Sequence, residues 1–550
     1  MVRSEGVADV VVVGSGAAGL TAALTAADVG LSVVVVEKAD LIGGTTAWSG
    51  GMPWVPLNKH QRELGIDDSR AEVMQYLDGL LEGREPSREL VDAFVDHAAE
   101  ALDFVESRTP LRMSTLSAYP DYYGDRPGAK LAGRSVEPEP REYRELLGDW
   151  FELVRESPLM PHVTREEMTS GADLVELSRQ RGEKGVRTMG GALVSALLAG
   201  VLERGVQVRT ATAARRLLTE GDRVVGLVAE HAGQELRMHA RLGVVLACGG
   251  FEGDPDLVRA YLGVADALAL SPAGNVGDGL RMGLVLGAAV GNMSSAVTRP
   301  CVWDGVSMLD GQPLPMMSNL RHDPACIIVN RHGRRFVNEG ISYMDMGKAL
   351  KAFDPRQAEY PDAGAVYMVF DQSARDRTRL GDLMPGAPTP HWVTQAETIE
   401  DLARAIGMPC DVLASEVARY NGFADSGEDS DFGRGTVWFE GLSAGGPTPQ
   451  RNMSRIERAP FYATRLRYGI FGTIGGLLTN GHGQVLRPKG ELIEGLYAVG
   501  NVAAGALGQT YPGGGSSLGP NITFGYLAGQ RLASDALAPG AMAADIEIGE

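Results

Sequence analysis

The chemistry that this sequence could support is concentrated in a glycine-rich stretch, Gly500–Pro520. An apolar, strand-like segment precedes it, and a segment that can form a helix, from about Ile522 to Ala536, follows it. In a strand–turn–helix arrangement, backbone N–H groups converge on an electron-rich acceptor at the helix N-terminus. Within the stretch, the Tyr511 hydroxyl and the Gly515 amide could donate to the same carbonyl oxygen. The alternative for three consecutive glycines is a flexible surface loop.

A second motif lies near the other end of the chain. The β-branched run Ala8–Gly14 predicts a buried parallel strand, and Ser32–Glu37 predicts a second one after an Ala- and Leu-rich helix. Between them stands G-x-G-x-x-G, whose glycines allow the turn, the approach of a pyrophosphate and close helix–strand packing. The acidic residue that ends the second strand would accept hydrogen bonds from a ribose. We therefore predict dinucleotide binding by Gly14, Gly16, Ala17, Ala18, Gly19, Glu37 and Lys38.

Two further glycine-rich segments fit the same site. Small and hydroxyl-bearing residues in Ile42–Gly51 suit a chain that runs against a phosphate and a flat ring. The apolar segment Leu242–Phe251 predicts another buried strand, which ends in two glycines and returns to the nucleotide. With the C-terminal stretch, these segments extend the predicted cofactor contacts to Gly43, Gly44, Thr45, Thr46, Ser49, Gly50, Gly51, Gly249, Gly250, Gly500, Asn501, Ser516, Ser517 and Leu518.

Composition and charge exclude several classes of function. A net charge of −19 argues against nucleic acid and against an anionic membrane surface as the main partner. No apolar run is long enough to span a bilayer, and the N-terminus enters a strand at once, without a signal peptide. The 4 cysteines are widely spaced, so neither a disulfide framework nor a metal site is expected. We expect a cytoplasmic protein.

The alternating strands and helices that must position these residues indicate an α/β protein. Because 550 residues are too many for one ordinary hydrophobic core, we expect two domains. From about Gly283 short strands, Pro and Met become common, which suits a pocket for an apolar ligand, although Met is more often core filler. We expect a Rossmann-like cofactor domain, 1–282 and 461–538, interrupted by an α+β substrate domain, 283–460. The tail, 539–550, should lie outside both.

Several motifs together resemble a known family. The segments V-V-G-S-G-A-A-G-L, V-V-E-K-A-D-L-I-G-G-T-T-A-W-S-G-G, V-V-L-A-C-G-G-F and G-L-Y-A-V-G-N are similar to those of the FAD-dependent fumarate reductase and succinate dehydrogenase flavoproteins. Pro120–Gly124, Asn338–Tyr343 and Tyr511–Gly515 resemble the 3-ketosteroid Δ1-dehydrogenases within that family. The resemblance implies an FAD domain interrupted by a catalytic domain, with the substrate held between them against the flavin.

The resemblance also implies roles for individual residues. Tyr343 would be the base that removes a proton from steroid position 2, and Tyr122 would support it by a hydrogen bond. Tyr119 or Tyr123 could take the supporting role instead. The Tyr511 hydroxyl and the Gly515 amide would hold the C3 carbonyl while hydride leaves position 1 for the flavin N5. A tyrosine with a pKa of about 10 is a poor base at neutral pH, so a hydrogen bond from a neighbouring phenol should lower the pKa of Tyr343.

Two departures from the family pattern narrow the function. Fumarate-reducing members carry a His where this chain has Phe471, so an apolar ring stands where a dicarboxylate would need a donor. No His precedes Thr46–Gly51 at the place where succinate dehydrogenases anchor their flavin, which predicts non-covalent FAD. The remaining partners would be an apolar 3-ketosteroid and an external electron acceptor, quinone-like or a dye. The alternatives are a flavoprotein that acts on another apolar ketone or enone, and a catalytically silent electron carrier.

Overall fold

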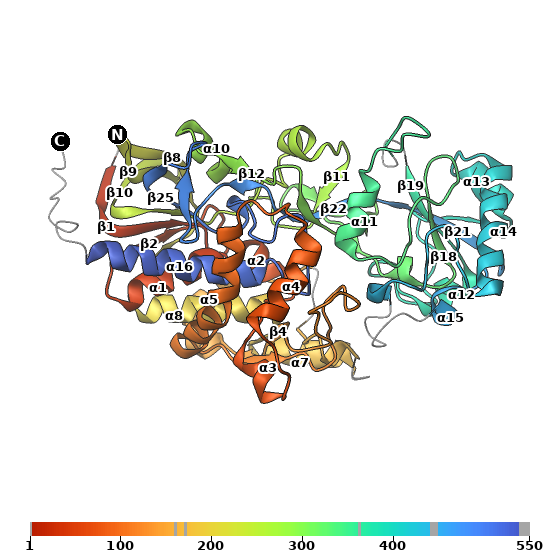
Figure 1. Cartoon of the computed structure of the whole chain (residues 1–550), viewed down its shortest axis with the longest axis horizontal. Helices are drawn as coiled ribbons and strands as arrows, with labels where there is room; N and C mark the ends of the chain where they lie inside the picture. The colour runs from red at the N-terminus through yellow and green to blue at the C-terminus, as the bar shows by residue number, and fades with distance from the viewer. Residues whose placement is uncertain (1–2, 159–161, 170–172, 361–364, 441–448, 538–550) are drawn as a thin grey trace.

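The computed structural model describes residues 3–158, 162–169, 173–360, 365–440 and 449–537. The predicted tail, 539–550, lies outside the described residues. The molecule is elongated, with a large sheet at one end and a smaller sheet at the other (Figure 1). This arrangement agrees with the predicted α/β class.

The large sheet has a parallel centre of the kind that the βαβ unit predicts, with antiparallel pairs at its ends. Its strand order is β24-β25-β10-β1-β2-β7, and the hairpin β8–β9 continues from β10. The strands β1, β2, β7, β10 and β25 pair in parallel. Their bounds are Arg3–Val13, Val33–Val36, Gln207–Arg209, Gln234–Leu246 and Leu492–Ala498, with β24 at Gln484–Leu486, β8 at Thr212–Glu220 and β9 at Arg223–His231. The predicted strands in the segments Ala8–Gly14, Ser32–Glu37 and Leu242–Phe251 are therefore confirmed.

The helices α1, α8 and α16 lie together beneath this sheet (Figure 1). Their bounds are Ala17–Asp28, Met189–Glu203 and Leu518–Ala536, so α16 begins four residues before the predicted start at Ile522. Small residues let α1 and α16 pack closely: a Cβ on Gly525 would lie 2.5 Å from the Ala18 carbonyl oxygen. This contact brings the N-termini of α1 and α16, both of which flank glycine turns, to the same edge of the sheet. The helix α5 (Arg88–Arg108) packs on α16, and α4 (Arg70–Leu81) packs on α5.

The second region is built on an antiparallel sheet with the order β18-β19-β21-β20. The strands span Cys326–Val329, Val366–Asp371, Phe461–Leu466 and Thr394–Ala396, and they pack with α13 (Ile399–Ala405) and α14 (Cys410–Ser426). The strand β21 begins at residue 461, so the predicted domain boundary at 460 falls inside this sheet, and the sheet continues to Leu466. The following strand β22, Tyr468–Thr473, pairs with β11 (Ala267–Ala269) and β13 (Ala296–Thr298) between the two regions. No helix among the described residues is long and apolar enough to cross a membrane.

Candidate active site

A cavity of about 1820 Å³ runs from the edge of the large sheet to the second region. Most of the residues that the sequence predicts as site residues line it. They are Gly14, Gly16, Ala17, Ala18, Glu37, Lys38, Gly44, Thr45, Thr46, Ser49, Gly50, Gly51, Gly249, Gly500, Asn501, Ser517 and Leu518, together with Tyr122, Tyr343, Tyr511 and Gly515. Gly43, Gly19, Gly250 and Ser516 do not line the cavity. They support its wall from behind.

The supporting residues have identifiable contacts. A Cβ on Gly19 would lie 2.1 Å from the Gly14 carbonyl oxygen, so α1 sits directly against the end of β1. The Gly43 amide donates to the Ser15 hydroxyl at 2.9 Å, and a Cβ on Gly250 would collide with Thr473. The Ser516 hydroxyl donates to the Gly513 carbonyl at 2.7 Å and fixes the three-glycine turn. These glycines are needed for close packing behind the cavity.

The part of the cavity at the sheet edge is built mostly from backbone. The N-cap residues of α1 and α16 form no side-chain cap, and the first residues of both helices line the cavity. Thr46 partly replaces a cap on α1, because its Oγ1 accepts from the Ala17 amide at 3.0 Å. The Glu37 carboxylate accepts from the Ser15 hydroxyl at 2.6 Å and the Ala39 amide at 2.9 Å, so it also holds the first glycine turn in place. Such a site favours a ligand with phosphate groups.

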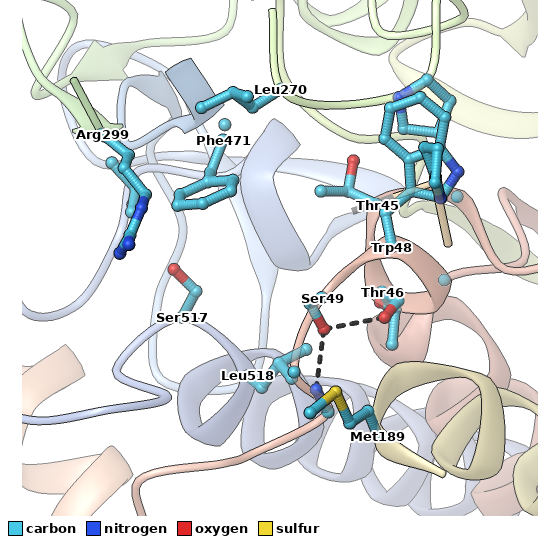
Figure 2. A pocket seen from close by; sticks show the side chains of 18 of the residues that line it. Thr45, Thr46, Trp48, Ser49, Met189, Leu270, Arg299, Phe471, Ser517 and Leu518 are labelled. Atoms are coloured by element: carbon cyan, nitrogen blue, oxygen red, sulfur yellow. Dashed lines mark hydrogen bonds between the residues drawn. The ribbon is translucent and has the colours of Figure 1, made fainter. Parts of the chain in front are cut away.

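Ser49 continues this wall from α2 (Gly44–Trp48), opposite Met189 and Leu518 (Figure 2). Its hydroxyl donates to the Thr46 carbonyl at 2.7 Å and accepts from the Gly51 amide at 3.0 Å. A Cβ on Gly51 would lie 2.2 Å from the Met189 backbone, so only glycine allows α8 to approach. The predicted segment of small residues is thus packed between α1 and α8.

The rest of the cavity brings together three tyrosines from distant segments. The Tyr122 and Tyr343 hydroxyls are 2.9 Å apart, and the Tyr511 ring lies 5.7 Å from the Tyr343 ring and 6.0 Å from the Tyr122 ring, between centroids. The Tyr119 hydroxyl lies 3.1 Å from that of Tyr122. Tyr123 instead donates to Asp345 at 2.7 Å. Of the three tyrosines in the 119–123 loop, Tyr122 is therefore the one that contacts Tyr343.

A buried polar network holds the loop that carries Tyr122. Asp121 accepts from the Trp54 indole N–H at 2.8 Å and from Arg134 at 2.7 Å, and Arg134 also pairs with Asp68. The Tyr122 amide donates to the Pro512 carbonyl at 2.9 Å. The loop is thereby tied to the turn that carries Tyr511 and Gly515.

Tyr511 and Gly515 meet as the glycine-rich sequence predicts. Gly515 has a φ of 98°, a conformation that favours glycine, and its carbonyl accepts from the Trp54 amide at 3.0 Å. Burial raises the pKa of Tyr511, while the Ser517 hydroxyl, the Tyr343 hydroxyl and the Gly515 amide oppose the rise by hydrogen bonding. The phenol oxygen and the Gly515 amide are therefore close together on the wall of the same cavity.

Burial dominates the electrostatics of the tyrosine cluster. It raises the pKa of Tyr343 well above the usual value, and the neighbouring Tyr511 and Tyr119 raise it further. The hydrogen bond from Tyr122 lowers the pKa of Tyr343, as the sequence predicts, and so does the positive charge of Arg299. The pKa of Tyr343 is nevertheless raised overall, because desolvation of the phenolate outweighs both contributions.

Comparisons with known proteins agree with this site. A family model described as an FAD binding domain matches residues 9–518. The chain is 39% identical to 4-oxocyclohexanecarboxylate 2-dehydrogenase of Sinomonas cyclohexanicum, over 96% of this chain and 93% of the relative. It is 38% identical to 3-oxosteroid 1-dehydrogenase of Mycobacterium tuberculosis H37Rv, over 96% and 98%. The chain belongs to this family of FAD-dependent dehydrogenases.

Solved structures support the same assignment. The 3-ketosteroid Δ1-dehydrogenase of Sterolibacterium denitrificans, in complex with 1,4-androstadiene-3,17-dione, matches with a TM-score of 0.87 and 32% identity. The match covers 96% of this chain and all of that one. A flavocytochrome c3 fumarate reductase, at 23% identity and a TM-score of 0.67, shares the fold. The predicted family and the cofactor FAD are confirmed.

The residues present fit FAD. A cradle of glycines that a Cβ would fill surrounds the N-terminus of α1, where a Cβ on Gly14 would lie 2.4 Å from the Ala247 carbonyl oxygen. The uncapped N-termini of α1 and α16 suit the pyrophosphate and the electron-rich edge of the flavin ring. Lys38, also in the wall, forms an ion pair with Asp278 at 2.6 Å. Among the described residues, no group of three or more His, Cys, Asp or Glu side chains could hold a metal ion.

Sequence reasoning missed the cationic side of the cavity. The cavity is lined by Arg299, Arg165 and Arg321, and none of these residues belongs to a sequence motif that indicates a functional site. Arg299 follows β13 and lies near Phe471 and Ser517 in Figure 2. The apolar ring of Phe471 had argued against a carboxylate in this place. The structure puts a guanidinium beside it.

Proposed function

We propose that this chain dehydrogenates a 3-ketosteroid at positions 1 and 2 to give a 1-ene-3-ketone, with FAD as the oxidant. The observation that carries the proposal is the meeting of the Tyr122, Tyr343 and Tyr511 side chains and the Gly515 amide in the same cavity as the FAD-binding residues. Two relatives named as ketone dehydrogenases, at 38% and 39% identity, support it.

The residues have complementary roles in the proposed reaction. The Tyr511 hydroxyl and the Gly515 amide hold the substrate carbonyl and stabilise the enolate that develops there, by roughly 3 kcal/mol for one such donor. Tyr343 takes the proton from position 2. Tyr122, hydrogen-bonded to Tyr343, supports the phenolate and passes the proton toward Tyr119. Bound FAD supplies the acceptor for the hydride from position 1.

The surroundings of the reaction are also proposals. The region between about residues 283 and 460 would form the substrate domain, with the continuation of its sheet to Leu466, and it would cover the ketone. FAD would be held without a covalent bond, an external quinone-like or dye acceptor would reoxidise it, and the protein would act in the cytoplasm.

One experiment tests the proposed reaction directly. Anaerobic mixing of the purified yellow protein with androst-4-ene-3,17-dione should bleach the flavin absorbance, whereas succinate should not. Bleaching by small cyclic ketones and not by the steroid would favour a related ketone dehydrogenase. Normal flavin binding without bleaching by any ketone would favour a silent electron carrier.

A second candidate function is the same dehydrogenation of a smaller cyclic ketone. A specific observation favours it: Arg299 places a positive charge in the substrate part of the cavity, where a steroid hydrocarbon skeleton offers no partner. The relative at 39% identity is named for a cyclic keto acid.

A further inference from the structure

The guanidinium of Arg299 lacks an acidic partner inside the cavity. Its Nη2 donates to the Asn319 side-chain oxygen at 2.7 Å, and its Nε is buried without a hydrogen-bond partner. In the described part of the chain no carboxylate lies within ion-pair distance of it. A guanidinium has five N–H donors, and leaving them unpaired away from water is costly.

The lack of a carboxylate partner distinguishes Arg299 from other arginines whose Nε is also buried and unpaired. Arg155 pairs with Asp310 at 3.1 Å, and Arg187 and Arg467 pair with Glu156 and Asp266. Each of those cations has a carboxylate that compensates its charge. Arg299 has only a neutral amide.

A second cation increases the positive charge in the same place. Arg165 lies over the Tyr119 ring at 5.5 Å, lines the cavity, and forms no ion pair among the described residues. Burial lowers the pKa of Arg299, the three tyrosines Tyr343, Tyr122 and Tyr119 raise it, and Arg165 lowers it. Because burial is the largest of these effects, the charge of Arg299 is poorly compensated where it lies, and an anion bound beside it would compensate that charge.

The position of Arg299 limits where that anion can be. Its guanidinium lies 5.5 Å from the centre of the Tyr343 ring, and Tyr343 is next to Tyr511, the proposed carbonyl ligand. Figure 2 shows its end directed toward Ser517, which follows the Gly515 turn. An anionic group that reaches Arg299 must therefore be on the ring that carries the ketone or on the next one, not at the far end of a steroid side chain.

We propose, as a development of the second candidate function, that Arg299, assisted by Arg165, binds a carboxylate of a cyclic keto acid substrate, in which the carboxylate lies about one ring from the ketone. The inference rests on the proposed ketone dehydrogenation but not on a steroid as the substrate. Cation–π stacking of Arg299 on Tyr343 explains its orientation. Its Nε is shielded from the cavity, but its terminal Nη groups are not, and among the described residues they have only the Asn319 side-chain oxygen as a partner, so a carboxylate in the cavity can bind there.

The test uses matched ligands on the FAD-loaded protein. The reactive pair is 4-oxocyclohexanecarboxylate and its neutral amide, compared by kcat/KM and by anaerobic flavin bleaching. The unreactive probe is cyclohexanecarboxylate, whose Kd is measured from the shift that it causes in the oxidised flavin spectrum. We expect the acid to exceed the amide at least tenfold in kcat/KM.

Variants locate the effect. Arg299→Gln should lower the ratio of kcat/KM for the acid to kcat/KM for the amide by roughly 10- to 100-fold, because a charged hydrogen bond is lost. It should weaken the binding of cyclohexanecarboxylate by a similar factor. Arg299→Lys should restore part of the kcat/KM ratio and part of the cyclohexanecarboxylate affinity. The control is Arg379→Gln, also in the cavity wall, whose partner Asp382 is 4.0 Å away and whose side chain is 59% exposed; it should leave the ratio as in the wild type. Retained flavin in each variant shows that the protein has folded.

The outcomes separate this inference from the proposed function. Equal use of acid and amide, or an equal loss of both in Arg299→Gln, would overturn the carboxylate site and leave Arg299 as a group that acts on Tyr343. Failure of cyclohexanecarboxylate to bind would also overturn it. If no ketone bleaches the flavin while cyclohexanecarboxylate binding depends on Arg299, the carboxylate site stands and the proposed dehydrogenation fails.

Discussion

The cofactor part and the substrate part of the cavity differ in the groups that form them, backbone in the first and side chains in the second. The cofactor part uses backbone N–H groups and glycines from segments that are short and continuous in the sequence, such as Gly14–Gly19. The substrate part uses the side chains of residues that are far apart in the sequence, from Tyr119 to Tyr511. The first should tolerate almost no added atom, because its geometry is set by close packing. The substrate part should tolerate substitutions that keep its hydroxyl and charged groups, and should lose activity where a hydroxyl or a charge is removed.

The largest effect is expected at the first glycine turn. Gly14→Ala places a Cβ 2.4 Å from the Ala247 carbonyl oxygen at a φ of 107°, so the strand and helix must separate. The purified variant should contain little or no FAD by absorbance. Gly30→Ala is the control, since Gly30 also has a positive φ, 89°, but open space around it. It should keep its FAD, and equal loss in both variants would show that backbone strain, not packing, decides cofactor binding.

The next effect is expected at the proposed base. Tyr343→Phe keeps the ring and removes the hydroxyl, so flavin reduction by substrate should slow by roughly 10² to 10⁴ while the FAD content stays unchanged. Rapid-mixing measurements of flavin absorbance give the rate. A wild-type rate in this variant would show that the proton leaves by another route.

The pH dependence sharpens the same assignment. Burial raises the pKa of Tyr343 and Tyr122, so the reactive phenolate is the minority form at neutral pH. The rate of flavin reduction should therefore rise with pH across the neutral and alkaline range, and Tyr343→Phe should abolish the rise. Arg299→Gln should move the rise to higher pH, because the positive charge of Arg299 lowers the pKa of Tyr343.

A somewhat smaller effect is expected at the carbonyl site. Tyr511→Phe removes one of two donors and leaves the Gly515 amide, which should cost about 10² to 10³ in flavin reduction. Ketone binding should weaken more in this variant than in Tyr343→Phe, since Tyr511 contacts the ground-state carbonyl. Equilibrium titration of the oxidised flavin spectrum compares the two. Equal weakening would remove the distinction between base and carbonyl donor.

The smallest effect is expected at Tyr123, which does not form a hydrogen bond with Tyr122 or Tyr343. Tyr123 donates to Asp345 and does not contact Tyr343, so Tyr123→Phe should change flavin reduction less than tenfold. Tyr122→Phe removes the hydrogen bond to Tyr343 and should have a clearly larger effect. The reverse order would assign the supporting role to Tyr123.

The cofactor part of this protein could be predicted from the sequence almost completely. Glycine spacing, β-branched strands and the position of Glu37 are local signals, because a turn, a strand and a helix N-terminus are each formed by neighbouring residues. The exceptions are instructive. Gly19, Gly43, Gly250 and Ser516 belong to the predicted motifs but support the wall from behind, which spacing alone does not reveal.

The substrate part was predicted only where a motif marked it. The tyrosines at 122, 343 and 511 came from the resemblance to a family, which left three candidates in the 119–123 loop. The hydrogen bond of Tyr122 to Tyr343 and that of Tyr123 to Asp345 separate them in space. No periodicity carries this information, since contacts between distant segments depend on how the loop and α11 (Tyr343–Leu350) pack.

The sequence by itself determined the FAD-binding fold and its cofactor, because the glycine turns, strands and helix N-termini that specify them arise from local backbone geometry. Only the tertiary structure decided the charge of the substrate part and the net direction of the pKa of Tyr343. Burial and the placement of Arg299 beside Tyr343 depend on contacts between separate segments of the chain, and desolvation has no signature in a linear sequence.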